Sequence, residues 1–131
     1  MVTIEHASVY ADDPKRAAEH LAALCGGAVE AFHPLPGGWV CLFDGTWSGA
    51  LLELYPRTSR LVSREGDVGF AKLRSPATGA GTHFNLKVDR SRAELERICT
   101  ARGLTFSWRS WAGFLDVWIE DGLLVELVCS G

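Results

Sequence analysis

Two histidines stand in similar strand-like segments, where they could act as metal ligands. His6 lies in residues 4–10, which alternate between two sets of side chains, and His83 lies in a second strand-like segment at residues 82–88. The alternation predicts β-strands with two distinct faces. We expect the face that carries the histidines to be the concave, ligand-facing side, because the opposite positions are more apolar and suit packing against helices.

Two glutamates interrupt apolar runs in later parts of the chain. Glu53 lies in the sequence LLEL at residues 51–54, and Glu126 lies in the sequence LVEL at residues 124–127. A carboxylate among residues that favour burial needs a salt bridge, a proton or a metal ion. Two imidazoles and two carboxylates together suit one divalent ion such as Zn²⁺, Ni²⁺, Co²⁺, Mn²⁺ or Fe²⁺.

The histidines belong to an internal repeat. His83 follows His6 by 77 positions, and Gly103 follows Gly26 by 77 positions as well, so a strand and the helix after it recur in register. Glu126 follows Glu53 by 73 positions, which places the two glutamates in corresponding last strands. Such self-similarity predicts two copies of one structural unit.

Each copy begins with a strand followed at once by a helix. The first helix is predicted to start after Asp12 or Asp13 and to end at residues 26–27, and the second to start after Asp89 or Ser91 and to end at Gly103. Further strand-like runs follow at residues 39–43 and 50–55 in the first copy, and at residues 105–108, 115–119 and 123–128 in the second.

Between the copies lies a segment rich in Gly, Ser, Arg and Pro. It covers residues 57–80 and contains one short apolar patch that includes Phe70. We predict a first module at residues 1–56, a connecting loop or lid at residues 57–80 and a second module at residues 81–131, all within one compact domain.

Four segments in this order resemble a known superfamily. Residues 4–9 (IEHASV) with Asp13, residues 51–54 (LLEL), residues 82–86 (THFNL) with the following Val88-Asp89, and residues 121–127 (DGLLVEL) are similar to the vicinal oxygen chelate superfamily, and most of all to its glyoxalase I-like branch. The resemblance spans nearly the whole chain. It implies an α+β fold in which two tandem βαβββ modules form half-barrels around a shared pocket.

The resemblance also implies a function. The positions that match the metal ligands of the superfamily are His6, Glu53, His83 and Glu126. The implied enzyme is a divalent-metal-dependent isomerase, epimerase or lyase, whose small substrate chelates the metal through two neighbouring oxygens and reacts by proton transfer through a metal-stabilised enediolate. Glu126 is the preferred base, although Glu53 could take that role instead.

Pocket candidates come from the same strand faces. They are Ser8, Leu51, Tyr55, Asn85, Trp39 and Trp118. The residues after Glu53 lack the asparagine found in authentic glyoxalase I, so a glutathione-linked substrate is not predicted.

Other functions stay open. An extradiol-type dioxygenase would use only His6, His83 and Glu126. A fosfomycin-type resistance activity also fits the ligand set. In a different class, a metal-free protein that binds small molecules or drugs, like the bleomycin-resistance proteins, shares this architecture. As a separate alternative to metal binding, Glu53 and Glu126 could pair with arginines, for which Arg57, Arg74 and Arg109 are available.

Composition limits the partners. The formal charge is −3, with 13 basic and 16 acidic residues, and this offers no footprint for nucleic acid or for an anionic membrane. Four cysteines without Cys-x-x-Cys spacing and an amino terminus unlike a signal peptide predict a cytoplasmic protein. The resemblance implies a homodimer, in which the ligands of one site come from one chain or from both.

Overall fold

The computed structural model describes residues 4–64, 67–77, 82–121 and 123–130. The first module comprises β1 (His6–Ala11), α1 (Pro14–Cys25), β2 (Ala28–Ala31), β3 (Trp39–Leu42) and β4 (Leu51–Pro56). Its four strands form a sheet in the order β1-β4-β3-β2, in which β1 runs parallel to β4 and the other pairs are antiparallel. This is the predicted βαβββ unit, although the short strand β2 was not located from sequence.

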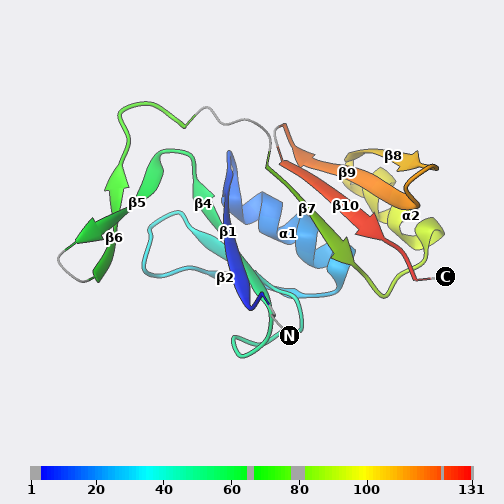
Figure 1. Cartoon of the computed structure of the whole chain (residues 1–131), viewed down its shortest axis with the longest axis horizontal. Coiled ribbons are helices and arrows are strands. Elements are labelled where there is room, and N and C mark those ends of the chain that lie inside the picture. The colour runs from blue at the N-terminus through cyan, green and yellow to red at the C-terminus, as the bar shows by residue number, and fades with distance from the viewer. Residues whose placement is uncertain (1–3, 65–66, 78–81, 122, 131) are drawn as a thin grey trace.

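The second module repeats this arrangement. It comprises β7 (Thr82–Lys87), α2 (Arg92–Arg102), β8 (Thr105–Arg109), β9 (Phe114–Glu120) and β10 (Leu123–Val128). The sheet order is β7-β10-β9-β8, and the first and last strands of the module are again parallel neighbours. Figure 1 shows the two sheets side by side, with the edge strands β1 and β7 toward the middle of the molecule. The predicted α+β class and the tandem modules are therefore confirmed.

The predicted helix ends are also present. The side chain of Asp13 accepts a hydrogen bond from the backbone N–H of Arg16, and Ser91 forms a capping box with Glu94 at the start of α2. Both helices end at a glycine in the left-handed conformation, which residues with a Cβ atom adopt only at a cost. No described helix is long and apolar enough to cross a membrane.

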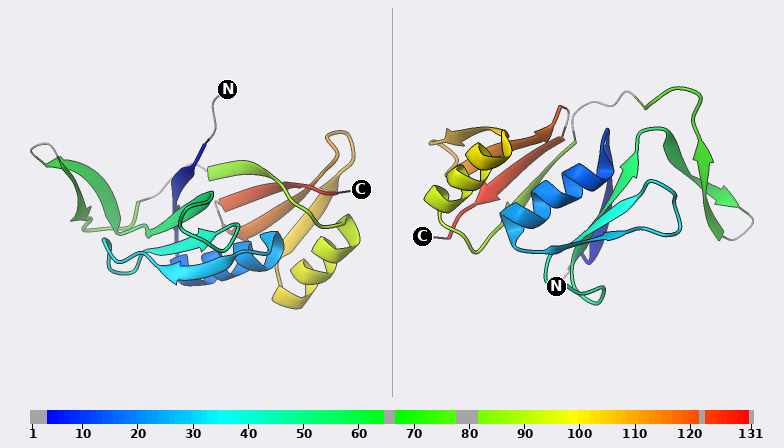
Figure 2. Two further views of the ribbon diagram at one scale, coloured as in Figure 1. Left: turned by 90° about the horizontal axis from the view of Figure 1, so that it is seen from below. Right: turned by 180° about the vertical axis from the view of Figure 1, so that it is seen from behind.

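Both helices lie on the same side of the sheets (Figure 2). The core between helices and sheets is continuous and includes fully buried leucines of α1, β4, α2 and β10: Leu21, Leu24, Leu54, Leu95 and Leu127. Because successive strand residues alternate between faces, the residues next to these leucines in β4 and β10 point to the helix-free side. This is the side on which the histidines and glutamates lie.

A hydrogen-bonded cluster ties the modules together. A carboxylate oxygen of Glu120, at the end of β9, lies 2.5 Å from the backbone nitrogen of Asp12, and the other oxygen lies 3.3 Å from that of Asp13. Arg57 binds Asp12 at 2.7 Å and Glu120 at 3.4 Å. The turn after β1 is therefore anchored to the second module. Arg57 forms ion pairs in this cluster with Asp12 and Glu120.

The connection between the modules contains a regular hairpin. Strands β5 (Ser59–Arg64) and β6 (Asp67–Lys72) pair antiparallel as a separate two-stranded sheet. The hairpin extends away from the rest of the molecule (Figure 1). We predicted a connecting loop or lid at residues 57–80, and the described part of this connection contains the paired strands β5 and β6. Residues 78–80 lie outside the described residues.

Candidate metal centre in two halves

The first half of the candidate site lies on the parallel pair β1 and β4. The register places His6 opposite Leu51 and Ser8 opposite Glu53, so His6 and Glu53 are diagonal neighbours on one face. The hydroxyl of Ser8 donates a hydrogen bond of 2.9 Å to Glu53 Oε2. The hydroxyl of Tyr55, on the same face of β4, donates to the same oxygen. Two hydroxyl groups therefore fix one oxygen of the carboxylate.

Tyr55 is suited to this supporting role. Burial, followed by its hydrogen bond to Glu53, raises the pKa of Tyr55 to about 12, so the hydroxyl keeps its proton at neutral pH. The ring stacks on Phe32 with centroids 5.6 Å apart and meets Phe70 of β6 edge-on at 5.3 Å. The hairpin thus packs against the aromatic residue that orients Glu53.

The second half of the site repeats the geometry on β7 and β10. His83 lies opposite Leu124 and Asn85 lies opposite Glu126, which again makes the histidine and the glutamate diagonal neighbours. His83 Nε2 lies 3.5 Å from Glu126 Oε1. The Glu126 side chain is 11% exposed and that of His83 is 64% exposed, so the carboxylate is held in the sheet while the imidazole remains accessible.

Glu126 also has neighbours that the sequence analysis did not assign to the site. Asp116 of β9 is its direct cross-strand partner, and Arg109 of β8 binds Asp116 Oδ2 through Nε at 2.9 Å and through a terminal nitrogen at 2.8 Å. The other terminal nitrogen of Arg109 lies 3.7 Å from Glu126 Oε2. The sequence does contain a signal for Asp116, because it is an acidic residue within the largely apolar strand FLDVWIE, as Glu53 and Glu126 are in their strands.

The two halves do not come together within one chain. In the part of the chain that the structure describes, no three His, Cys, Asp or Glu side chains are grouped closely enough to hold a metal ion. His6 with Glu53 and His83 with Glu126 therefore form two separate half-sites. Both open on the helix-free side of their sheets, where nothing in the described chain bridges them.

The chemistry of each half-site fits a divalent metal. Metal–nitrogen and metal–oxygen bonds of about 2.1 Å place two adjacent ligand atoms of one ion about 3 Å apart. The 3.5 Å between His83 Nε2 and Glu126 Oε1 is close to this separation. In the first half-site, the hydroxyls bind one oxygen of Glu53, and within the described chain the other oxygen has no hydrogen-bond donor. Each half could thus offer one imidazole and one carboxylate oxygen.

The predicted pairing of the glutamates with arginines is found only in part. Arg109 approaches Glu126, whereas Arg57 binds other carboxylates, and in the described structure no arginine makes an ion pair with Glu53. Glu53 is therefore satisfied by neutral hydroxyl donors, and Glu126 by a charged donor that it shares with Asp116.

Most predicted pocket residues lie on the ligand-facing surfaces. Ser8, Leu51 and Tyr55 share the face of Glu53, and Asn85 and Trp118 share that of Glu126. Trp39 does not. It pairs with the buried Leu54, packs against the core and lies under the Lys15 ammonium of α1, so its side chain lies on the helix-covered face and not on the face of Glu53. The strand alternation was misassigned at this one residue.

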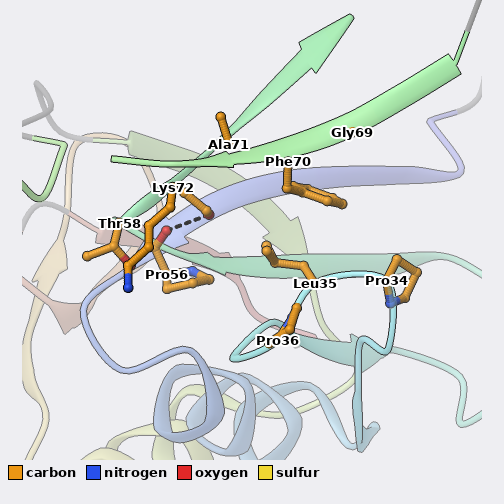
Figure 3. A pocket seen from close by; sticks show the side chains of 10 residues that line it. Pro34, Leu35, Pro36, Pro56, Thr58, Gly69, Phe70, Ala71 and Lys72 are labelled. Atoms are coloured by element: carbon orange, nitrogen blue, oxygen red, sulfur yellow. Dashed lines mark hydrogen bonds between the residues drawn. The ribbon is translucent and has the colours of Figure 1, made fainter. Parts of the chain in front are cut away.

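One cavity of the described structure lies next to the β5–β6 hairpin. It has a volume of about 660 Å³ and separates the β5–β6 hairpin from the turn of residues 34–36. Figure 3 shows Phe70 and Lys72 on one side and Leu35 between two prolines on the other. None of the four predicted metal ligands lines it.

Comparisons with known proteins identify the fold. No family model matches the chain, and no curated protein sequence matches it. Solved structures match over nearly the whole chain. Lactoylglutathione lyase from Agrobacterium tumefaciens is 21% identical with a TM-score of 0.58, and the match covers 98% of this chain and 93% of that one. A possible glyoxalase from Bacillus cereus is 17% identical with a TM-score of 0.58, covering 98% and 100%.

A third match has a different named role. The fosfomycin resistance protein FosX from Mesorhizobium loti is 12% identical with a TM-score of 0.62, covering 100% of this chain and 94% of that one. At these identities the likeness concerns the fold. Together with the paired βαβββ modules, it shows that this chain has the vicinal oxygen chelate fold, the fold of glyoxalase-type and fosfomycin-resistance proteins.

Proposed function

We propose that this protein is a divalent-metal-dependent, glyoxalase-like enzyme, an isomerase, epimerase or lyase that acts on a small substrate with two neighbouring oxygens. The observation that carries the proposal is the equivalence of the half-sites. In both modules a histidine on the first strand and a glutamate on the last strand are diagonal neighbours on the helix-free face. Packing requirements do not explain why this polar pair occurs twice.

The protein would bind the ion through His6, Glu53, His83 and Glu126. When bound, a divalent ion polarises the substrate oxygens and makes the adjacent carbon more acidic. The chain's own residues would then move the proton. A carboxylate oxygen of Glu126 would accept the proton from that carbon and return it to the product, while Ser8 and Tyr55 keep Glu53 in place.

A homodimer would complete the site. We propose that His6 and Glu53 of one chain face His83 and Glu126 of a second chain. The separation of the half-sites within one chain supports this arrangement, as does the exposure of both histidines on open sheet faces. In such a dimer, two identical sites would form from four half-sites.

Elemental analysis tests the metal centre. Protein purified without added metal is compared with a His6→Ala/His83→Ala double variant, after both have been shown to fold. We expect about one divalent ion per wild-type chain and almost none in the variant. The double variant His20→Gln/His33→Gln is the matched control, because it removes two histidines that lie on neither ligand-facing strand, and it should retain the metal. Equal metal content in wild-type protein and the His6→Ala/His83→Ala variant would remove the proposal.

Activity assays then separate the reactions. Proton exchange at a carbon that carries one of the two neighbouring oxygens, followed by NMR in deuterated water, reports the proposed proton transfer. Lactoylglutathione and fosfomycin belong in the panel, because structures with this fold include a lactoylglutathione lyase and fosfomycin resistance proteins. Metal-dependent turnover of a catechol with oxygen would instead support the dioxygenase.

A metal-free small-molecule-binding protein is the second candidate. The contact between Arg109 and Glu126 favours it, since the guanidinium partly neutralises this carboxylate without a metal ion. The elemental analysis separates the two candidates. A wild-type protein that binds a small ligand with no metal, and keeps this affinity in the presence of a chelator, would establish the second.

A further inference from the structure

Two carboxylates face each other directly in the second half-site. Glu126 of β10 and Asp116 of β9 are paired in the antiparallel register, and both residues are more than nine-tenths buried. Like charges at directly opposite positions destabilise a sheet unless a cation lies between them. Arg109 supplies this cation, with two bonds of 2.8 and 2.9 Å to Asp116 and one longer contact of 3.7 Å to Glu126.

The pair is specific to the second module. The position of the first sheet that corresponds to Asp116 is Val40, which is the cross-strand partner of Glu53. Glu53 therefore has no second carboxylate beside it in that register. The charged pair is an addition to the repeat, placed next to one of the two predicted metal-binding glutamates.

Arg109 lies closer to Asp116 than to Glu126. It binds Asp116 through two atoms and Glu126 only at the outer limit of an ion pair, while its guanidinium also lies 5.2 Å from the ring of Phe114. Within the described structure, the second oxygen of Asp116, Oδ1, is buried without a hydrogen-bond partner. Asp116 thus carries a buried acceptor whose loss of hydration no hydrogen bond offsets, although its other oxygen is bound by Arg109.

We propose that Asp116 and Arg109 are positioning residues that set the affinity of Glu126 for a cation. Asp116 retains Arg109 by the closer contact, and this leaves Glu126 available as a ligand. This inference rests on the proposed function, because it takes Glu126 to be a metal ligand. It predicts that removing Asp116 and removing Arg109 change metal affinity in opposite directions. An ion pair with a purely structural role would not produce opposite changes.

Metal titration of two variants that each remove one charge tests the proposal. In Asp116→Asn, Arg109 loses its charged partner and moves fully to Glu126, where it competes with the metal. Zn²⁺ affinity should therefore fall by about ten- to a hundredfold. In Arg109→Gln, two uncompensated carboxylates remain, and Zn²⁺ affinity should rise by about tenfold. The double variant should lie between the single variants.

Matched controls remove a similar charge elsewhere. Arg92→Gln and Glu96→Gln break an ion pair of 2.7 Å on α2, and Arg92 also lies over an aromatic ring, as Arg109 does. Both controls should leave Zn²⁺ affinity within about twofold of wild type. The absorption spectrum of bound Co²⁺ gives a second readout, and it should change in Asp116→Asn but in neither control.

The outcomes separate the two proposals. If wild-type protein binds neither Zn²⁺ nor Co²⁺, the proposed function and this inference both fail. If wild-type protein binds metal and the two variants shift its affinity in the same direction, or not at all, only this inference fails. Thermal unfolding checks each variant first. Should Arg109→Gln fail to fold, Asp116→Asn decides alone, since unchanged or tighter binding would overturn the proposal.

Discussion

The hydroxyl of Tyr55 donates a hydrogen bond to Glu53, two residues earlier on the same face of β4. Ser8, on the neighbouring strand, donates to the same carboxylate oxygen. A carboxylate held in this way presents its other oxygen in one orientation, as supporting residues do in metal sites. Tyr55 therefore links the hairpin to the candidate metal ligands, because its ring contacts Phe70 of β6 and its hydroxyl binds Glu53.

Removing this hydroxyl should weaken metal binding. We expect Tyr55→Phe to lower Zn²⁺ affinity by about tenfold, because Glu53 loses a donor that orients it. Calorimetric titration measures the change. Tyr10→Phe is the matched control, since Tyr10 lies opposite Tyr55 in the register but no hydrogen bond joins it to Glu53 in the described structure. Equal affinities of the two variants would contradict a role for Tyr55 in orienting Glu53.

The assignment of sheet faces predicts unequal effects of two leucine substitutions in β4. Leu54 is fully buried against the helices, whereas Leu51 is half-buried on the ligand-facing side. Leu54→Ala should lower the free energy of unfolding by about 2–5 kcal/mol, and Leu51→Ala by roughly 1 kcal/mol. Urea denaturation measures both changes. A larger loss for Leu51→Ala would show that the faces are assigned in the wrong sense.

His20 predicts a pH dependence of stability. Its Nδ1 lies 3.2 Å from a terminal nitrogen of Arg102, which joins α1 to α2. Burial, and then the charges of Arg102 and Arg16, lower the pKa of His20 below its ordinary value of 6.5. As the pH falls below 6.5, His20 therefore binds a proton more readily in the unfolded state than in the folded state. The folded state loses stability in this range until the pH reaches the lower pKa that His20 has when folded.

Thermal unfolding at several pH values checks this. The Tm of wild-type protein should fall more steeply between about pH 7 and pH 5 than that of His20→Gln, which cannot titrate. His33→Gln is the control and should keep the wild-type slope. Parallel slopes for wild type and His20→Gln would exclude His20 as the group responsible.

Phe70 predicts how the hairpin is anchored. Its ring contacts those of Tyr55 at 5.3 Å and Phe32 at 6.2 Å, and such aromatic pairs contribute about 0.5–1.5 kcal/mol each. Phe70→Ala should therefore speed hydrogen exchange of the backbone amides in β5 and β6. Exchange measured by mass spectrometry tests this, with the exposed Arg60→Ala as control. Unchanged protection in Phe70→Ala would mean that other contacts hold the hairpin.

The internal repeat explains why so much of the fold could be predicted. Correspondence of His6 with His83 and of Glu53 with Glu126 predicts two modules, and alternation places these residues on one face. Strand β2 was missed because it is only four residues long and carries two alanines. The hairpin was missed because its polar residues resemble a loop. Its residue Phe70 contacts Tyr55 and Phe32, which precede it by 15 and 38 positions, and no local pattern reveals such contacts.

The candidate site was predicted less completely, for a physical reason. Residue types identify which side chains could bind a metal, but not how adjacent strands pair. Asp116 becomes a neighbour of Glu126 only through the register of β9 and β10, and Arg109 through that of β8 and β9. Whether two half-sites meet in one chain also depends on how the modules pack, which no local pattern determines.

We propose that His6 and Glu53 of one chain and His83 and Glu126 of another bind one metal ion, and a mixed dimer tests this claim directly. Two differently tagged chains, His6→Ala/Glu53→Ala and His83→Ala/Glu126→Ala, can be coexpressed and the mixed dimer isolated through both tags. Each homodimer should contain no metal, because every site lacks one half. The mixed dimer combines the two intact halves in one of its two sites, so elemental analysis should find one metal ion per dimer. A folded mixed dimer that contains no metal would contradict the claim.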